Sequence, residues 1–150
     1  MVIEDVLIGL APNGSEVATT DIGVHIVSDV TGVVVRHCRI AVDNTGVQAQ
    51  GATSNTTIEL NEISSPAAGN TGTVDGISLL SLAGDANVIR HNRVRDMGGA
   101  GVEIGGAGPV AGLVVRGQYS GTQRRRLRRT VDGARRDRDR ATLGCLEHSR

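Results

Sequence analysis

The stretch NVIRHNRVRDMGGAGVEIGG, residues 87–106, contains the two short patterns that decide the fold of this chain. The first pattern is a β-branched residue, a polar turn and a second apolar residue, here spanning Ile89 to Val94. The second is a glycine followed by apolar, polar and apolar residues, here spanning Gly101 to Ile104. Alternation with a period of two indicates strands rather than helices.

Both patterns recur along the chain in step. The glycine pattern begins at Gly23, Gly46, Gly76 and Gly101, so successive copies lie 23, 30 and 25 residues apart. The turn pattern begins at Val35, Ile58, Ile89 and, in a frayed copy, Val115, so its copies lie 23, 31 and 26 residues apart. Two patterns that lengthen and shorten together belong to one repeating unit, and a unit of this size is typical of a solenoid.

The composition agrees with narrow stacked coils. The 150 residues include 21 glycines and one tyrosine but no phenylalanine or tryptophan, so the core must consist of Val, Ile, Leu and Ala. We expect the apolar positions of both patterns to form inward columns, with Val6 and Ile8 pointing inward from a partial first coil. The members of these columns are Val24, Val47, Ile77 and Val102; Ile26, Ala49, Leu79 and Ile104; Val33, Val35, Thr56, Ile58, Leu113 and Val115; and Ile40, Ile63 and Val94.

Polar residues recur at the bend of the turn pattern. Asn61 and Asn92 occupy the same place, where Cys38 and Gln118 stand in the flanking copies. Stacked asparagines hydrogen-bond along the stack, and asparagine tolerates left-handed backbone angles at a tight corner. Cys38 is expected to be a structural free thiol. The outward neighbours form two columns of alternating charge, which we interpret as ladders that fix the register of the coils: Arg36, Glu59 and Arg90; and Arg39, Glu62 and Arg93.

The runs NVIRHNRVRDMGGAGVEIGG and NTTIELNEISS resemble the repeats of right-handed parallel β-helix proteins, the superfamily that includes pectate lyases, polygalacturonases and alginate epimerases. The resemblance spans about residues 20–118 and implies an all-β fold. We therefore predict a right-handed parallel β-helix of about four coils, followed by an irregular or partly helical basic tail. Members of the superfamily usually have more coils, so the chain resembles a fragment of a longer β-helix, and its uncapped coil ends are candidates for self-association.

The resemblance does not extend to one activity. Of the elements that polygalacturonases combine, the chain has a counterpart only at residues 74–77, and the acidic-histidine signature of alginate epimerases is missing. A lysine base is excluded because the chain contains no lysine, whereas an arginine base, as pectate lyases use, stays open. The sequence does not decide whether the protein is an enzyme, and it identifies no catalytic residue.

The insertion from Ser64 to Asp75 is the place where function is most expected, because inserted loops concentrate binding residues. Asp43, Asp75 and Asp96 lie beside this corner in neighbouring coils and are the candidate binding residues. Their carboxylates could form an acidic patch that binds Ca²⁺, and the sequence predicts no other cofactor. The favoured interpretation is that aspartate is simply a good turn former. No Cys or His spacing predicts any other metal site.

The charge distribution divides the chain into two predicted domains, repeats over residues 1–118 and an Arg-rich tail over residues 119–150. The first carries 6 Arg and 12 acids, a net charge of −6, and the second carries 10 Arg and 4 acids, a net charge of +6. Three interpretations of the tail remain: a disordered or short helical segment, a frame-shifted end of a longer β-helix, and an arm for nucleic acid or an acidic polymer. The last is disfavoured because no aromatic residues for base stacking are interleaved with the arginines.

Two functions follow from this sequence. One is a carbohydrate-associated β-helix related to polysaccharide lyases, hydrolases and epimerases, with a polysaccharide as partner. The other is a non-catalytic structural, surface or periplasmic solenoid, or an inactive fragment. The first ten residues do not resemble a secretory signal and no segment resembles a membrane span, so we expect no membrane partner. An extracellular or periplasmic location is implied only by the resemblance.

Overall fold

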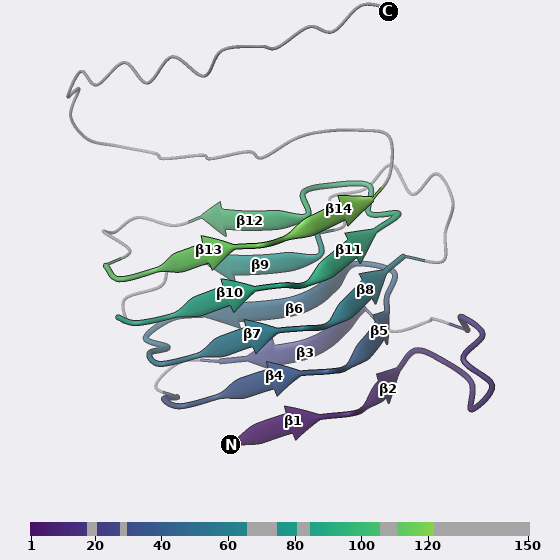
Figure 1. Ribbon diagram of the computed structural model, residues 1–150, viewed down its shortest axis with the longest axis horizontal. Helices are drawn as coiled ribbons and strands as arrows, with labels where there is room; N and C mark the ends of the chain where they lie inside the picture. Colours follow the sequence, from purple (N-terminus) through teal and green to yellow (C-terminus); the bar gives the residue numbers. More distant parts are fainter. Residues whose placement is uncertain (18–20, 28–29, 66–74, 81–84, 106–110, 122–150) are drawn as a thin grey trace, which may run out of the picture.

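The computed structural model describes residues 1–17, 21–27, 30–65, 75–80, 85–105 and 111–121. Within these ranges, short parallel strands form three sheets (Figure 1). The first sheet contains, in spatial order, β1 (Val2–Glu4), β4 (Val34–Arg36), β7 (Thr57–Glu59), β10 (Val88–Arg90) and β13 (Val114–Arg116). The second contains β2 (Leu7–Ile8), β5 (Arg39–Ala41), β8 (Glu62–Ser64), β11 (Arg93–Arg95) and β14 (Tyr119–Gly121). The third contains β3 (Ile22–Ile26), β6 (Thr45–Gln50), β9 (Ile77–Leu80) and β12 (Val102–Gly105).

Each sheet takes every third strand of the chain, so the backbone winds around one axis as a parallel β-helix. One turn of the winding, a coil, contributes one strand to each sheet, as β7, β8 and β9 do. The predicted all-β solenoid is confirmed. Four coils supply all three strands, and a fifth supplies β13 and β14. Within the described ranges the chain forms no helix with the length and apolar character of a membrane span.

The fifth coil extends the stack past the boundary expected between residues 118 and 119. Strand β14 pairs in parallel with β11, with Tyr119 opposite Arg93. This strand follows Gln118 in the frayed copy of the turn pattern that begins at Val115. Residues 122–150 lie outside the described residues, so the three interpretations of the Arg-rich tail stay predictions.

The core consists of the predicted apolar columns. In the third sheet Val24 lies opposite Val47, which lies opposite Ile77, and all three side chains are buried. In the second sheet Ile40 and Ile63 form the equivalent pair. Each fully buried side chain of this kind contributes roughly 1.5–3 kcal/mol, so aliphatic residues alone can hold the coils together.

At the ends of the stack, one inward assignment is wrong, and one residue lies in its predicted column without being buried. Val6 is 39% exposed, and the first coil instead packs Ile3 and Ile8 against the core. Val115 stands opposite the buried Ile89 but is 38% exposed. The alternation places Val115 on the inner side, but β13 is the last strand in the order of its sheet, so no strand of the described residues covers its far side.

The glycines that open the first three copies of their pattern are required by close packing between coils. A Cβ at Gly46 would overlap Cγ2 of Ile63 and would lie 2.5 Å from the carbonyl oxygen of Gly76 in the next coil. The equivalent clashes at Gly23 and Gly76 involve Ile40 and Val94. Any side chain at these positions would force the strands of the third sheet away from the second sheet.

The stacked asparagines lie inside the corner between the first and second sheets. The side-chain Nδ2 of Asn61 donates to Oδ1 of Asn92 at 3.0 Å and to the carbonyl oxygen of Val35 at 3.0 Å. Its Oδ1 accepts the backbone N–H of Cys38 at 3.0 Å. The predicted ladder along the stack is confirmed, and Cys38 is a buried free thiol at its end.

The left-handed backbone angle falls one residue before the asparagine, which corrects the sequence-based expectation. The residues with positive φ in this column are Asp5, His37, Leu60, His91 and Gly117, at 56°, 53°, 55°, 54° and 61°. The asparagine therefore follows the strained residue and turns its amide inward, where it satisfies backbone groups that a sharp corner would otherwise leave unpaired. At Gly117 the lack of a side chain also leaves room for the ring of His91.

The outward charges of the first two sheets form the expected ladders. Glu59 lies in register between Arg36 and Arg90 and forms an ion pair with Arg90. In the neighbouring column Glu62 lies in register between Arg39 and Arg93. It contacts Arg39 at 3.4 Å, and its other ion-pair partner is Arg95, at 3.3 Å, in place of Arg93. Opposite charges in register favour one alignment of the coils over a slipped one.

Candidate functional site

A buried aspartate, Asp75, lies two residues before strand β9 of the third sheet. The backbone of Asp75 accepts a hydrogen bond from the N–H of Gly46, and Gly76 donates to the carbonyl oxygen of Ala100. These bonds place Asp75 beside Ala100 in the next coil. Its Oδ1 accepts the backbone N–H of Ala100 at 2.6 Å, and the residue is only 8% exposed.

Glu103 completes a carboxyl pair with Asp75. It lies on β12 in register with Ser78 of β9, and the Ser78 hydroxyl donates to its Oε2 at 3.2 Å. Burial raises the pKa of Asp75 to about 6, the Ala100 N–H opposes that rise, and a hydrogen bond and charge repulsion from Glu103 add to it. Asp75 therefore holds its proton to a higher pH than an ordinary aspartate does.

Glu103 ends a row of polar side chains that crosses the third sheet. His25 lies opposite Gln48, which lies opposite Ser78. His25 is exposed, Gln48 and Glu103 are half-buried, and Ser78 is buried. The row thus combines an imidazole, an amide, a hydroxyl and a carboxyl group at the spacing of neighbouring strands, about 4.8 Å.

The three aspartates predicted from the sequence are distributed along the linkers between the second and third sheets. Asp96 directly follows β11 and contacts Arg95, with 3.3 Å between Nη1 and Oδ2. Asp43 lies two residues after β5, whereas Asp75 lies at the far end of its linker and pairs with Glu103. Most of the inserted loop, residues 66–74, lies outside the described residues.

The described residues include no group of three or more His, Cys, Asp or Glu side chains that could hold a metal ion. The Ca²⁺ patch at Asp43, Asp75 and Asp96 therefore stays a prediction, to be tested by titration with the metal. The sequence pointed to Asp75 but not to its partner, because Glu103 was grouped only with the outward row. The signal was present: Asp75 and Ala100 each precede an aligned glycine, which places Glu103 one coil above.

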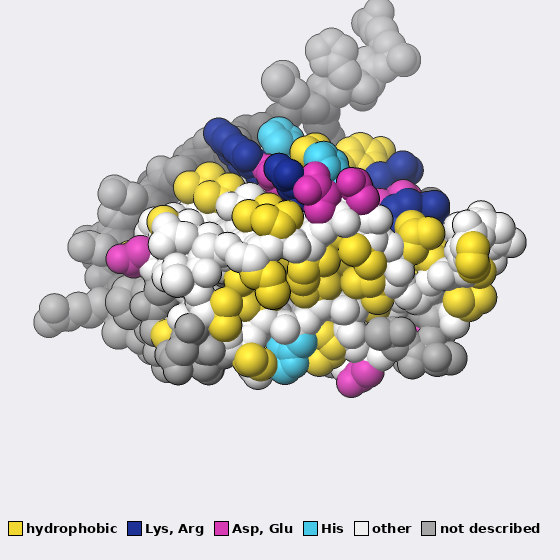
Figure 2. All heavy atoms as spheres, turned by 90° about the horizontal axis from the view of Figure 1, so that it is seen from below, with side chains coloured by type: hydrophobic (Ala, Val, Ile, Leu, Met, Phe, Trp, Pro, Cys, Tyr) yellow, Lys and Arg dark blue, Asp and Glu magenta, His cyan; other side chains and the backbone are white. Residues whose placement is uncertain are grey.

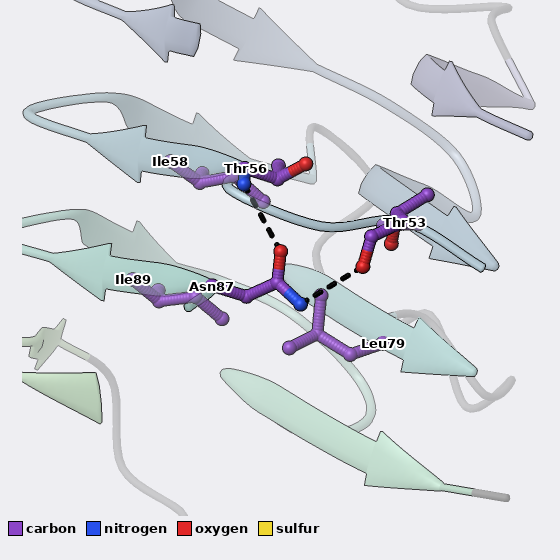
Figure 3. Close-up of a pocket in the computed structure, with 7 residues that line it drawn as sticks. Thr53, Thr56, Ile58, Leu79, Asn87 and Ile89 are labelled. Atoms are coloured by element: carbon purple, nitrogen blue, oxygen red, sulfur yellow. Dashed lines mark hydrogen bonds between the residues drawn. The ribbon is translucent and has the colours of Figure 1, made fainter. Parts of the chain in front are cut away.

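A small cavity lies inside the corner between the third and first sheets (Figure 3). Asn87 crosses it, accepting the N–H of Thr56 through Oδ1 and donating from Nδ2 to the carbonyl oxygen of Thr53, both at 3.0 Å. Ile58, Ile89 and other apolar side chains form the rest of its wall. With room for about one water molecule, it is a feature of core packing and not a ligand site.

Comparison with known proteins identifies the family. The family model described as "Right handed beta helix region" matches residues 13–119. No curated protein and no solved structure shows significant similarity to the chain. The match covers more than two thirds of the 150 residues and coincides with the stacked coils. The chain therefore belongs to the right-handed β-helix family.

Proposed function

We propose that this β-helix binds a polysaccharide across its third sheet, beside Asp75 and Glu103, and is related to polysaccharide lyases, hydrolases and epimerases. The observation that carries the proposal is the buried carboxyl group of Asp75 next to Glu103, which ends the polar row of the third sheet. Sugar hydroxyl groups both donate and accept hydrogen bonds, and the row offers both kinds of partner. Its regular spacing suits a ligand that is itself a repeating polymer.

The carboxyl pair gives the site an acid that works near neutral pH. A carboxyl group with a pKa of about 6 still holds its proton where an ordinary aspartate is ionised. A single carboxyl group with a raised pKa supports ligand binding or proton donation at this site.

The proposal is tested with a panel of acidic and neutral polysaccharides, with and without Ca²⁺. Binding is measured by calorimetry, lyase activity by unsaturated products and hydrolysis by new reducing ends. We expect binding of at least one polymer, and we expect Glu103→Gln to weaken it about tenfold or more. Asp85→Asn is the matched control, because Asp85 is an exposed carboxylate and should not contribute. Absence of binding and of products across the whole panel contradicts the proposal.

The second candidate is a non-catalytic structural solenoid. The observation in its favour is that the charges of the first two sheets are engaged with one another, as in the pairs Arg36–Glu4 at 2.9 Å and Arg39–Glu62 at 3.4 Å. Such ladders hold coils in register and leave less charge for a ligand. A chain that folds stably but binds nothing in the panel would favour this function.

A further inference from the structure

Within the described residues, the two ends of the stack are unpaired sheet edges with exposed apolar side chains. Strands β1 and β2 end the first and second sheets on one side, and β13 and β14 end them on the other. Figure 2 looks onto the N-terminal end, where hydrophobic side chains gather across the centre. Val2 is 57% and Leu7 45% exposed there, and Val114 is 43% exposed at the opposite end. Open edges of this kind are templates for pairing with another chain.

We propose that the N-terminal end of one copy docks onto the C-terminal end of a second copy, so that β1 and β2 of one pair in parallel with β13 and β14 of the other. The contact is head-to-tail, because the two surfaces that meet are different. Repetition of such a contact produces open filaments rather than closed dimers. This inference is independent of the polysaccharide proposal.

The backbone supports this partner, because every coil of the first sheet already bonds to its predecessor in the same way. The first residue of each strand donates its N–H to the carbonyl oxygen that precedes the strand one coil below. The four bonds are Val34 to Met1 at 2.9 Å, Thr57 to Val33 at 2.8 Å, Val88 to Thr56 at 2.8 Å and Val114 to Asn87 at 2.9 Å. In the docked pair, Val2 would donate in the same way to the carbonyl oxygen of Leu113 in the second copy.

The second sheet repeats the arrangement. Arg39 donates to the carbonyl oxygen of Val6 at 3.0 Å, and Tyr119 donates to that of Asn92 at 2.9 Å. By the same rule, Leu7 would donate to the carbonyl oxygen of Gln118 in the second copy. A second copy of this chain thus offers the edge with the required register on two sheets at once.

Charge complementarity selects the same arrangement. Glu59 lies between two arginines, Arg36 and Arg90. Glu4, at the N-terminal end, has only Arg36 as its in-register neighbour. Arg116, at the C-terminal end, has only Arg90, a residue of the same charge. Docking would place Glu4 between Arg36 and the second copy's Arg116, which reproduces the surroundings of Glu59.

Analytical ultracentrifugation of the full chain over a range of concentrations tests the proposal. We expect the sedimentation coefficient of the unaltered protein to rise with concentration. Val2→Lys should abolish that rise, because it places a charge at the docking edge. Val17→Lys is the matched control, because Val17 is 56% exposed, nearly the same as Val2, but lies outside the strands of the three sheets. A rise that persists in Val2→Lys, or is lost equally in Val17→Lys, overturns the proposal.

A mixture of two blocked variants distinguishes head-to-tail from head-to-head docking. Val2→Lys blocks one end and Val114→Lys the other, so each alone should be monomeric, and an equimolar mixture should form a one-to-one dimer through the two free ends. Dimers of Val114→Lys by itself would show head-to-head docking and overturn the proposed register. An unaltered protein that stays monomeric at every concentration would overturn the interface itself. Circular dichroism of each variant confirms that it is folded.

Discussion

The middle coils and the end coils of this β-helix contain similar residues in different surroundings. Val35, in the second coil, is fully buried, whereas Val115, at the equivalent position of the fifth coil, is 38% exposed. Asn61 bonds to groups in the coils below and above, whereas Gln118 has a neighbouring coil on one side. A residue of this fold therefore contributes through the coils that cover it, as in other solenoids.

The largest difference between the two regions is expected for glycine. Gly46→Ala in the second coil should destabilise the protein by about 3–4 kcal/mol or prevent folding, because the new methyl group overlaps Ile63 and the Gly76 carbonyl. Gly105→Ala in β12 should cost less than about 1 kcal/mol, because its Cβ meets only the flexible end of Leu80, at 3.3 Å. Urea unfolding of both variants measures the difference, and equal losses would contradict the close approach of the coils.

The asparagine ladder should show the next largest effect. Asn61→Ala removes the partners of the Cys38 N–H and of the Val35 carbonyl oxygen, both in the buried corner. We expect a loss of about 2–3 kcal/mol. Gln118→Ala at the end of the same column should cost less than about 0.5 kcal/mol. Thermal unfolding compares the stability of the two variants. If Asn61→Ala caused no loss of stability, water or another group would have to pair with the backbone groups of the corner.

Val35 and Val115 are the same type of residue at equivalent positions, so comparing them separates the effect of burial from that of side-chain type. Val35→Ala should cost about 2 kcal/mol, because the side chain is fully buried. Val115→Ala should cost about a third of that, because the side chain is 38% exposed. If end-to-end docking covers Val115, the loss of stability caused by Val115→Ala should increase with protein concentration. The same variant therefore also tests the proposed assembly. Equal costs at high dilution would show that the end coil is covered by something else.

The smallest effect concerns Asp75, which joins a middle coil to the end strand β12 through Glu103. The folded-state pKa of Asp75 is about 6, above its usual 3.8, so between these values only the folded state holds the proton. The stability of the protein should therefore fall as the pH rises from about 4 to about 6.

The Asp75→Asn variant should lack this pH dependence. Its free energy of unfolding should exceed that of the unaltered protein by about 1–2 kcal/mol at pH 8 and should equal it near pH 4. Asp85→Asn, in an exposed position, is the control and should change neither value. Unfolding free energies measured across this pH range decide the matter, and a higher stability of the unaltered protein at pH 8 would contradict the raised pKa.

Much of the fold was predictable because the same sequence pattern recurs four times along the chain. The columns through Val47 and Ile63 follow directly from alternation and spacing. The left-handed corner residue was assigned one position too late, because His37, Leu60 and His91 share a backbone angle but no side-chain chemistry. The exposure of Val6 and Val115 could not be read locally, since burial depends on which coils lie beyond them.

The candidate site was predictable only in part. Asp75 was identified as a residue beside an inserted loop, but it was grouped with Asp43 and Asp96 by proximity to one corner. Its pairing with Glu103 depends on the alignment of Gly76 with Gly101 across linkers of different length. The raised pKa of Asp75 depends on its burial, which cannot be predicted from the residues next to it in the sequence.

The central claim is that residues about two dozen positions apart are vertical neighbours in a continuous stack. Nuclear Overhauser effects between methyl groups of protein labelled at Val and Ile test it most directly. The structure predicts contacts from Val47 to both Val24 and Ile77, its in-register partners in the coils below and above. A spectrum in which Val47 contacts neither residue would contradict the claim.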